Sequence, residues 1–195
     1  MKYDNEITVE VDLSLDELIN LLLDRGFKKR EEYTINDIYM VDKNCSMETS
    51  YLEVLKHCIL IREIRGEKRC RNVLTYKYKE FNEKNEIIKQ GKINVGIDNN
   101  ENAKEFFETI GYKKLVTIKD EVIVFEDGNM EFCVQHVNNK HVYIEIEQKS
   151  NYIDKFYSST DEIIKAFNMY NIPIKRKDYF VKKAEIELKE KYGEV

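Results

Sequence analysis

Segments in which polar and apolar residues alternate are the feature of this sequence that most constrains its fold. Residues 6–12 read Glu-Ile-Thr-Val-Glu-Val-Asp, and residues 144–147 read Ile-Glu-Ile-Glu. Because successive side chains of a β-strand point to opposite faces, each segment places polar side chains on one face and apolar side chains on the other. The polar face would meet solvent in a flat sheet, or the interior of a barrel whose apolar outer face is covered by helices. The alternation does not decide between these architectures.

The rest of the chain predicts further strands and helices. Strands are expected at residues 27–41, 58–64, 73–81, 87–97, 115–125, 130–137 and 142–148, with hairpin turns at Asp127-Gly128 and Asn138-Asn139. A helix is expected after the capping box of Ser14 and Glu17, a second at residues 101–110 and a third after Ser159. A last amphipathic helix is expected to carry Phe180, Val181, Ala184 and Leu188.

The chain is expected to form a single domain over residues 1–195. It contains only 7 glycines and 1 proline, and no Gly- or Ser-rich linker divides it. The sequence Gly26-Phe27-Lys28-Lys29 recurs as Gly111-Tyr112-Lys113-Lys114, each time after a predicted helix and before a predicted strand. This echo predicts two similar strand–helix–strand halves that contribute to one antiparallel sheet.

Composition argues against several classes of protein. Lys and Arg number 32 against 37 Asp and Glu, and a formal net charge of −5 argues against a general nucleic-acid-binding surface. No apolar run approaches the roughly 20 residues of a membrane span, and the first residues lack the apolar core of a signal peptide. The 4 cysteines have no CxxC or zinc-ligand spacing, which is typical of reduced thiols. A cytoplasmic protein is therefore expected.

The most specific local pattern is the carboxylate pair Glu145 and Glu147. The two residues are separated by one position, so a strand presents both on one face. Carboxylates placed in this way can share a divalent cation such as Mg²⁺ or Mn²⁺, which prefers oxygen ligands. A solvated strand face would show the same pattern, so the pair alone does not indicate a metal site.

The order of motifs along nearly the whole chain resembles the CYTH family of triphosphate tunnel metalloenzymes. That family includes class IV adenylate cyclases, thiamine triphosphatases and inorganic triphosphatases. The matching positions are Glu6 (of Glu-x-Glu-x-Lys), Asp37-Ile38-Tyr39, Arg62, Leu74-Thr75-Tyr76-Lys77, Lys119 (of Lys-x-Arg), residues 135–137 and 143–147 (of Asp-x-Val…Phe-x-Glu-Ile-Glu) and the basic-Tyr segment 175–179. Each motif is weak alone, but their order and spacing together are specific.

The resemblance implies an α+β fold, an antiparallel eight-stranded β-barrel with flanking helices whose charged faces point inward and form a tunnel. It implies that glutamates bind Mg²⁺ or Mn²⁺, namely Glu6, Glu145 and Glu147. Glu10 and Glu121, which the family pattern does not supply, are expected as supplementary ligands of this chain. It implies phosphate contacts from Arg62, Lys77, Lys119, Lys175 and Lys177. The implied catalytic residues are Glu6, Glu147 and Lys77. Such a site suits phosphoryl chemistry, which depends on positioning, charge neutralisation and metal bridging.

Departures from the family pattern mark a divergent member. Residues that differ from the usual ones are Thr8, Glu10, Leu60, Asn94, Glu121 and Gln135. At Glu10 the family has Lys, and at Glu121 it has Arg, so both positions reverse a charge. Each reversal near a polyanion replaces attraction with repulsion.

Two functions follow as hypotheses. The first is a metal-dependent enzyme acting on a small-molecule triphosphate or nucleotide, either a triphosphate hydrolase or an adenylate cyclase of the class IV type. Hydrolysis comes first because the sequence identifies no adenine pocket. The second is a CYTH-like module that has lost turnover and binds a phosphorylated metabolite, a metal ion or an anionic partner. Neither a membrane nor a nucleic acid is expected as a partner, and a homodimer stays open.

Overall fold

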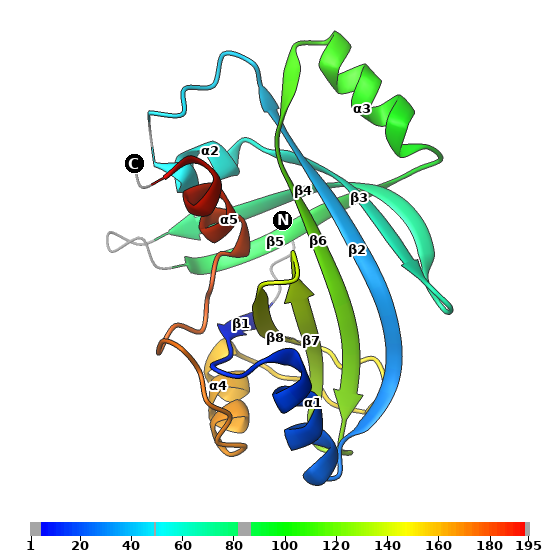
Figure 1. Ribbon diagram of the computed structural model, residues 1–195, viewed down its shortest axis with the longest axis vertical. Coiled ribbons are helices and arrows are strands. Elements are labelled where there is room, and N and C mark those ends of the chain that lie inside the picture. Colours follow the sequence, from blue (N-terminus) through cyan, green and yellow to red (C-terminus); the bar gives the residue numbers. More distant parts are fainter. Residues whose placement is uncertain (1–4, 49, 82–86, 194–195) are drawn as a thin grey trace. The chain divides into compact units, whose positions relative to one another are not determined.

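The structure is a computed structural model that describes residues 5–48, 50–81 and 87–193 (Figure 1). Within these residues the strands are β1 (Glu6–Glu10), β2 (Lys28–Asp42), β3 (Ile59–Gly66), β4 (Cys70–Phe81), β5 (Ile87–Ile97), β6 (Tyr112–Glu126), β7 (Glu131–Val137) and β8 (His141–Glu147). The helices of the same residues are α1 (Leu15–Asp24), α2 (Tyr51–Lys56), α3 (Asn100–Thr109), α4 (Thr160–Asn168) and α5 (Lys183–Tyr192).

The strands belong to one sheet. Over the described residues it is an 8-stranded sheet with the order β1-β8-β7-β6-β2-β3-β4-β5. The ladders β1–β8, β7–β8, β6–β7, β3–β4 and β4–β5 are antiparallel. The predicted α+β class, with eight antiparallel strands and flanking helices, is therefore confirmed.

Local sequence signals set the ends of several helices. The Ser14 hydroxyl accepts a hydrogen bond from the backbone N–H of Glu17, whose carboxylate accepts one from the Ser14 N–H, so the predicted capping box begins α1. Ser159 likewise caps α4. Gly26 and Gly111 follow α1 and α3 with φ angles of 84° and 97°, in the left-handed region that favours glycine.

Two elements differ from the sequence prediction. α2 was not expected, because a helix of 6 residues gives no readable periodicity. The last helix begins at Lys183, so Phe180 and Val181 lie outside it. They run alongside β1 instead, where Phe180 forms a parallel bridge with Thr8 and the Val181 N–H donates to the Thr8 carbonyl at 3.0 Å. This pairing gives backbone groups of β1 partners on the edge that β8 does not use.

The chain folds into two compact units, each built from segments that are distant in sequence. Unit 1 comprises Met1–Tyr3, Thr34–Lys119 and Lys182–Val195, and unit 2 comprises Asp4–Tyr33 and Asp120–Val181. β2 and β6 pass from one unit into the other. The expectation of a single domain over residues 1–195 stays a prediction.

The echo in the sequence corresponds to a structural repeat. The first repeat is β1, α1 and β2, and the second is β5, α3 and β6. α1 and α3 each have 10 residues, β2 and β6 each have 15, and a glycine separates helix from strand in both. Strands β3 and β4 follow the first repeat as β7 and β8 follow the second. When each strand is exchanged for its counterpart, the order of the sheet reads the same from the opposite edge. The predicted strand–helix–strand halves are present.

Each unit has its own apolar core. In unit 2 the apolar faces of β1, β7 and β8 pack against α1 and α4, and Leu18, Phe132 and Phe167 are among the fully buried side chains. In unit 1 a second apolar cluster contains Met40 of β2, Ile61 of β3 and Phe107 of α3. The opposite faces of these strands carry polar side chains, as the alternation in the sequence predicts.

The described residues contain neither a disulfide bond nor a helix that could span a membrane. All four cysteines are free thiols in the described residues. Burial raises the pKa of the Cys58 thiol to about 12, which keeps it protonated and unreactive at neutral pH. In the part of the chain that the structure describes, every helix is too short or too polar to cross a bilayer.

Candidate functional site

Three glutamates of unit 2 gather on one face of the sheet, and we call them the glutamate group: Glu6, Glu145 and Glu147. β1 and β8 pair in a register that puts Glu6 opposite Glu147 and Thr8 opposite Glu145. One carboxylate oxygen of each glutamate lies within 4.8 Å of those of the other two, and all three side chains are half-buried. Carboxylates this close repel one another, and oxygens at this spacing can coordinate one divalent cation. The structure therefore brings together the three residues predicted as the main metal ligands.

The opposite face of the same strands holds the glutamate group in place. Ile7, Ile144 and Ile146 alternate with the glutamates, and all three are buried in the core beneath α1 and α4. Gln135 of β7 adds a hydrogen bond from its Nε2 to the Glu145 carboxylate at 3.4 Å. Ligands carried on packed, paired strands keep their spacing better than ligands on loops.

Glu10 lies further along β1, where cations surround its carboxylate. Its Oε1 lies 2.8 Å from Lys175 Nζ and 3.0 Å from His141 Nδ1, and its Oε2 lies 3.5 Å from the Arg176 guanidinium. Burial raises the pKa of the Glu10 carboxyl, but the hydrogen bonds and charges of Lys175 and His141 outweigh burial and hold the pKa below its ordinary value. Glu10, predicted as a supplementary metal ligand, and Lys175, predicted as a phosphate contact, therefore neutralise each other's charge.

Glu121 lies on the other face of the sheet from the glutamate group. Glu121 of β6 lies opposite His136 of β7 and shares its face. The preceding residue of β7, Gln135, points to the opposite face, where it hydrogen-bonds Glu145. The Glu121 Oε2 lies 3.6 Å from His136 Nδ1, and its side chain is 59% exposed. The buried acid on the face of Gln135 is Asp120, the residue before Glu121 in β6. The structure therefore does not bring Glu121 to the other predicted metal ligands.

Two further predicted phosphate contacts lie at the surface. Lys119 of β6 is exposed and, by alternation along the strand, shares the face of Glu121. Lys177 is exposed in the segment between α4 and α5. Neither residue belongs to the glutamate group.

Unit 1 carries a buried ion pair among several cations. Arg62 of β3 donates two hydrogen bonds to Asp37 of β2, from Nε to Oδ1 and from Nη2 to Oδ2, both at 2.6 Å. Burial raises the pKa of the Asp37 carboxyl, but the charges of Arg62, Lys77 and Lys183 outweigh burial and lower it overall. Asp37 therefore fixes the orientation of the Arg62 guanidinium, and two lysines lie within electrostatic range of the pair.

Lys77 faces a second lysine across the sheet. The register of β4 and β5 puts Lys77 opposite Lys92 and Thr75 opposite Asn94, and the Thr75 hydroxyl donates to Asn94 Oδ1 at 2.8 Å. β4 and β5 are the counterparts of β8 and β1. The β1–β8 pair of unit 2 thus carries facing glutamates, Glu6 and Glu147, and its counterpart pair β4–β5 in unit 1 carries facing lysines, Lys77 and Lys92.

A cavity of about 350 Å³ in unit 1 lies apart from these lysines. It lies on the apolar side of the sheet, between α3 and the strands β4 and β5, and its lining includes Leu74, Ile97 and Phe106. The lining contains no Lys or Arg. This cavity therefore does not suit a polyphosphate.

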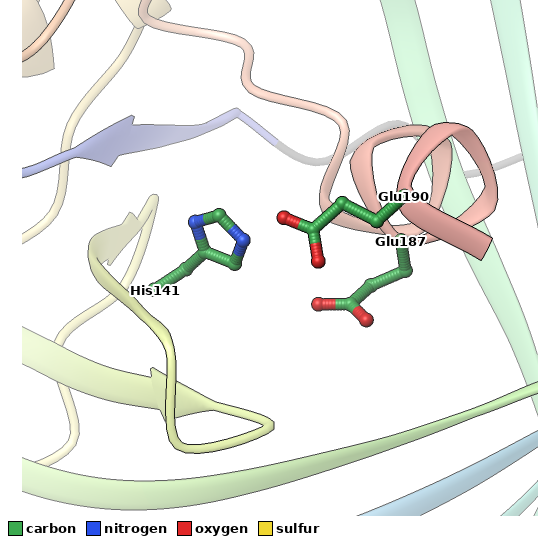
Figure 2. A group of neighbouring side chains, drawn as sticks. All are labelled: His141, Glu187 and Glu190. Carbon is green, nitrogen blue, oxygen red and sulfur yellow. The ribbon is translucent and has the colours of Figure 1, made fainter. Parts of the chain in front are cut away.

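Figure 2 shows His141 of β8 with Glu187 and Glu190 of α5, side chains of the types that bind metals. His141 belongs to unit 2 and the two glutamates to unit 1, so each is described within its own unit. In unit 2, His141 contacts the Glu10 carboxylate. In unit 1, Glu187 is buried and Glu190 exposed on α5. No site is assigned to the three residues.

Comparison with known proteins gives matches in solved structures. No family model matches the sequence, and no curated protein does. The PH1819 protein of Pyrococcus horikoshii OT3 is similar over 96% of this chain and 99% of its own, with a TM-score of 0.71 and 18% identity. A "putative adenylate cyclase" of Vibrio parahaemolyticus is similar over 95% of this chain and 98% of its own, with a TM-score of 0.59 and 11% identity.

A third match has a lower TM-score. A chain of the Schizosaccharomyces pombe Mediator head module is similar over 87% of this chain and 92% of its own, with a TM-score of 0.51 and 9% identity. At identities this low the matches show the fold alone. They agree with the CYTH-like fold that the sequence motifs predict.

Proposed function

We propose that this chain is a metal-dependent enzyme that acts on a small molecule bearing a triphosphate, with Mg²⁺ or Mn²⁺ as cofactor. The observation that carries the proposal is the reversal of charge between the repeats, with facing glutamates in unit 2 and facing lysines in unit 1. Like charges directly opposite on neighbouring strands destabilise a sheet. Each pair therefore favours a ligand of opposite charge, a divalent cation for the glutamates of unit 2 and a polyphosphate for the lysines of unit 1.

The glutamate group is the proposed metal site. Its three carboxylates, with oxygens within 4.8 Å of one another, suit a hard cation that prefers oxygen ligands. A cation bound there would neutralise charge on the phosphoryl group and make a water ligand more acidic. Glu6 of β1 and Glu147 of β8 lie directly opposite each other, so we assign the catalytic role to these two carboxylates.

Arg62 and Lys77 are the proposed phosphate contacts. The two hydrogen bonds to Asp37 hold the Arg62 guanidinium in one orientation before substrate arrives, which reduces the entropy lost on binding. Lys77 adds a positive charge on a flexible stem, which can follow the phosphate during the reaction. Lys183 lies within electrostatic range of the same ion pair and contributes to the positive potential.

Hydrolysis of the terminal phosphate is the reaction we place first. Of the described residues 60–77 and 92–96, those on the polar face of β3, β4 and β5 include no aromatic ring on which adenine could stack. The name of the Vibrio parahaemolyticus protein makes cyclisation of a nucleotide the second reaction to test.

Binding without turnover is a second candidate function. It is favoured by Glu10, whose buried carboxylate pairs with the exposed Lys175 at a position where the family carries a cation. The likeness to a chain of the Mediator head module adds that this fold also occurs in that module.

Phosphate release tests the proposal. Purified protein is incubated with Mg²⁺ or Mn²⁺ and inorganic triphosphate, ATP or thiamine triphosphate, with coupled pyrophosphatase to make cyclase turnover visible. Glu147→Gln keeps the size of the side chain but removes one ligand charge, and it should lower turnover at least 100-fold. Glu32→Gln is the matched control in unit 2, because Glu32 is an exposed residue paired with Lys29. It should stay within about twofold of wild type.

The outcomes separate the two candidate functions. Turnover that is lost in Glu147→Gln and kept in Glu32→Gln supports the enzyme. If no substrate is consumed, calorimetry with the same compounds decides next. Tight binding without consumption supports the binding module, and turnover equal in both variants points to a contaminant and rejects the proposed site.

A further inference from the structure

We propose that Lys92 is a second phosphate-contacting residue and forms one anion subsite with Lys77. The inference rests on the proposed function and deepens it, because the matched sequence motifs include Lys77 and not Lys92. The subsite lies wholly within unit 1, on the polar face of β4 and β5. Its ligand is the negatively charged end of a polyphosphate.

The register of the two strands fixes the distance between the lysines. Residues directly opposite on antiparallel strands have Cβ atoms about 4.5–5.5 Å apart, and Lys77 and Lys92 are such a pair. The adjacent pair locks this register, because Thr75 is fully buried and its hydroxyl donates to Asn94 Oδ1 at 2.8 Å. Lysine stems are long enough for two ammonium groups on this spacing to contact oxygens of one phosphate chain.

The charges around the pair favour an anion. The positive charges of Arg62, Lys77 and Lys183 all act on the carboxylate of Asp37. Lys92 adds a further cation, and its neighbour on the same face, Asn94, is an amide that adds no negative charge. Two ammonium groups held opposite each other repel, and an anion between them replaces that repulsion with two attractions.

The subsite should favour ligands with a high density of negative charge. Two point charges on neighbouring strands gain more from a chain of phosphates, which offers oxygens to both, than from a single phosphate. The gain depends on exposed groups, since Lys92 is exposed, and should therefore shrink as salt is added.

Calorimetry of inorganic triphosphate binding to the full chain tests the subsite. The titration is run in EDTA at low salt with wild type, Lys92→Ala, Lys92→Arg and Lys104→Ala. Lys104 is the matched control, because it lies on α3 and pairs with Glu108 at 3.4 Å. Lys92→Ala should weaken binding about 5- to 10-fold, and Lys92→Arg and Lys104→Ala should stay within about twofold. The Mn²⁺ affinity of Lys92→Ala should equal that of wild type.

The results distinguish a failed subsite from a failed function. Equal triphosphate affinity in Lys92→Ala and Lys104→Ala, with wild-type turnover intact, overturns the subsite and leaves the enzyme standing. A Lys92-dependent affinity without turnover supports the subsite and overturns the enzyme. Absence of triphosphate binding by wild type overturns both, and a parallel loss of Mn²⁺ affinity in Lys92→Ala assigns Lys92 a structural role instead.

Discussion

Replacing Glu147 by Gln should change stability in opposite directions with and without a divalent cation. The carboxylate oxygens of the glutamate group lie within 4.8 Å of one another, a distance at which two charges repel by about 0.9 kcal/mol in water and about 3.5 kcal/mol at an effective dielectric of 20. The side chains are half-buried, and Glu147→Gln removes two of these repulsions. After a discount for screening, the cation-free protein should gain about 1 kcal/mol in free energy of unfolding.

The sign reverses when the cation is bound. A cation at 100 times its dissociation constant stabilises the folded protein by about 2.7 kcal/mol. Losing one of three carboxylate ligands should weaken the cation at least tenfold, which removes about 1.4 kcal/mol or more of that stabilisation. Glu147→Gln should therefore be less stable than wild type in excess Mn²⁺.

Urea unfolding in EDTA and in excess Mn²⁺ measures both effects. In thermal melts, 1 kcal/mol corresponds to about 2–4 °C for a chain of this size. Glu32→Gln should shift the unfolding free energy by less than about 0.5 kcal/mol in either condition. If Glu147→Gln shifts stability equally in EDTA and in Mn²⁺, the three carboxylates do not share a cation and the reasoning is refuted.

Three further predictions concern the Asp37–Arg62 ion pair, the sheet face of Glu121 and the backbone at Gly26. Asp37→Asn breaks the ion pair with Arg62 and should cost about 3 kcal/mol at neutral pH. The folded-state pKa of Asp37 lies below its ordinary value of 3.8, so this contribution is complete above that pH and is lost as pH falls through the lower folded value; urea unfolding at a series of acid pH values should give a flatter profile for the variant. Glu121→Gln should leave phosphate release within about twofold, because Glu121 lies on the other sheet face, and a loss as large as that of a ligand variant would place it at the cation. Gly26→Ala, at a φ of 84°, should lower the melting temperature by about 2–4 °C, whereas Gly96→Ala, where a Cβ meets nothing within 4 Å, should change it less; equal shifts would contradict the argument.

Much of the fold was predictable because its causes are local. The capping box of Ser14 and Glu17 begins α1, and the glycines with positive φ follow α1 and α3. Alternation gave the polar and apolar faces of β1 and β8 directly. α2 was not predicted because a helix of 6 residues is too short to show a periodic pattern. Phe180 is not part of the last helix because the Phe180–Val181 segment pairs with the backbone of β1.

The candidate site was predictable only in part. Alternation places Glu10 on the face of Glu6, but the segment that brings Lys175 to its carboxylate lies far away in sequence. For Glu121 the signal was ambiguous, because β6 buries side chains on both faces, and alternation cannot tell which face meets the glutamates. Lys92 alternates with apolar neighbours in β5, which is a readable strand signal, but its significance depends on the residue opposite.

The sequence by itself determined the strands, the starts of α1 and α4, and that Glu145 and Glu147 share a face. These properties depend on side-chain alternation and on hydrogen bonds between residues a few positions apart. Tertiary structure alone decided that Glu6 meets Glu147, that Lys77 meets Lys92 and that Glu10 is neutralised by Lys175. The physical reason is that strand register is set by packing between segments distant in the chain, and a shift of one residue would turn each of these side chains to the other face.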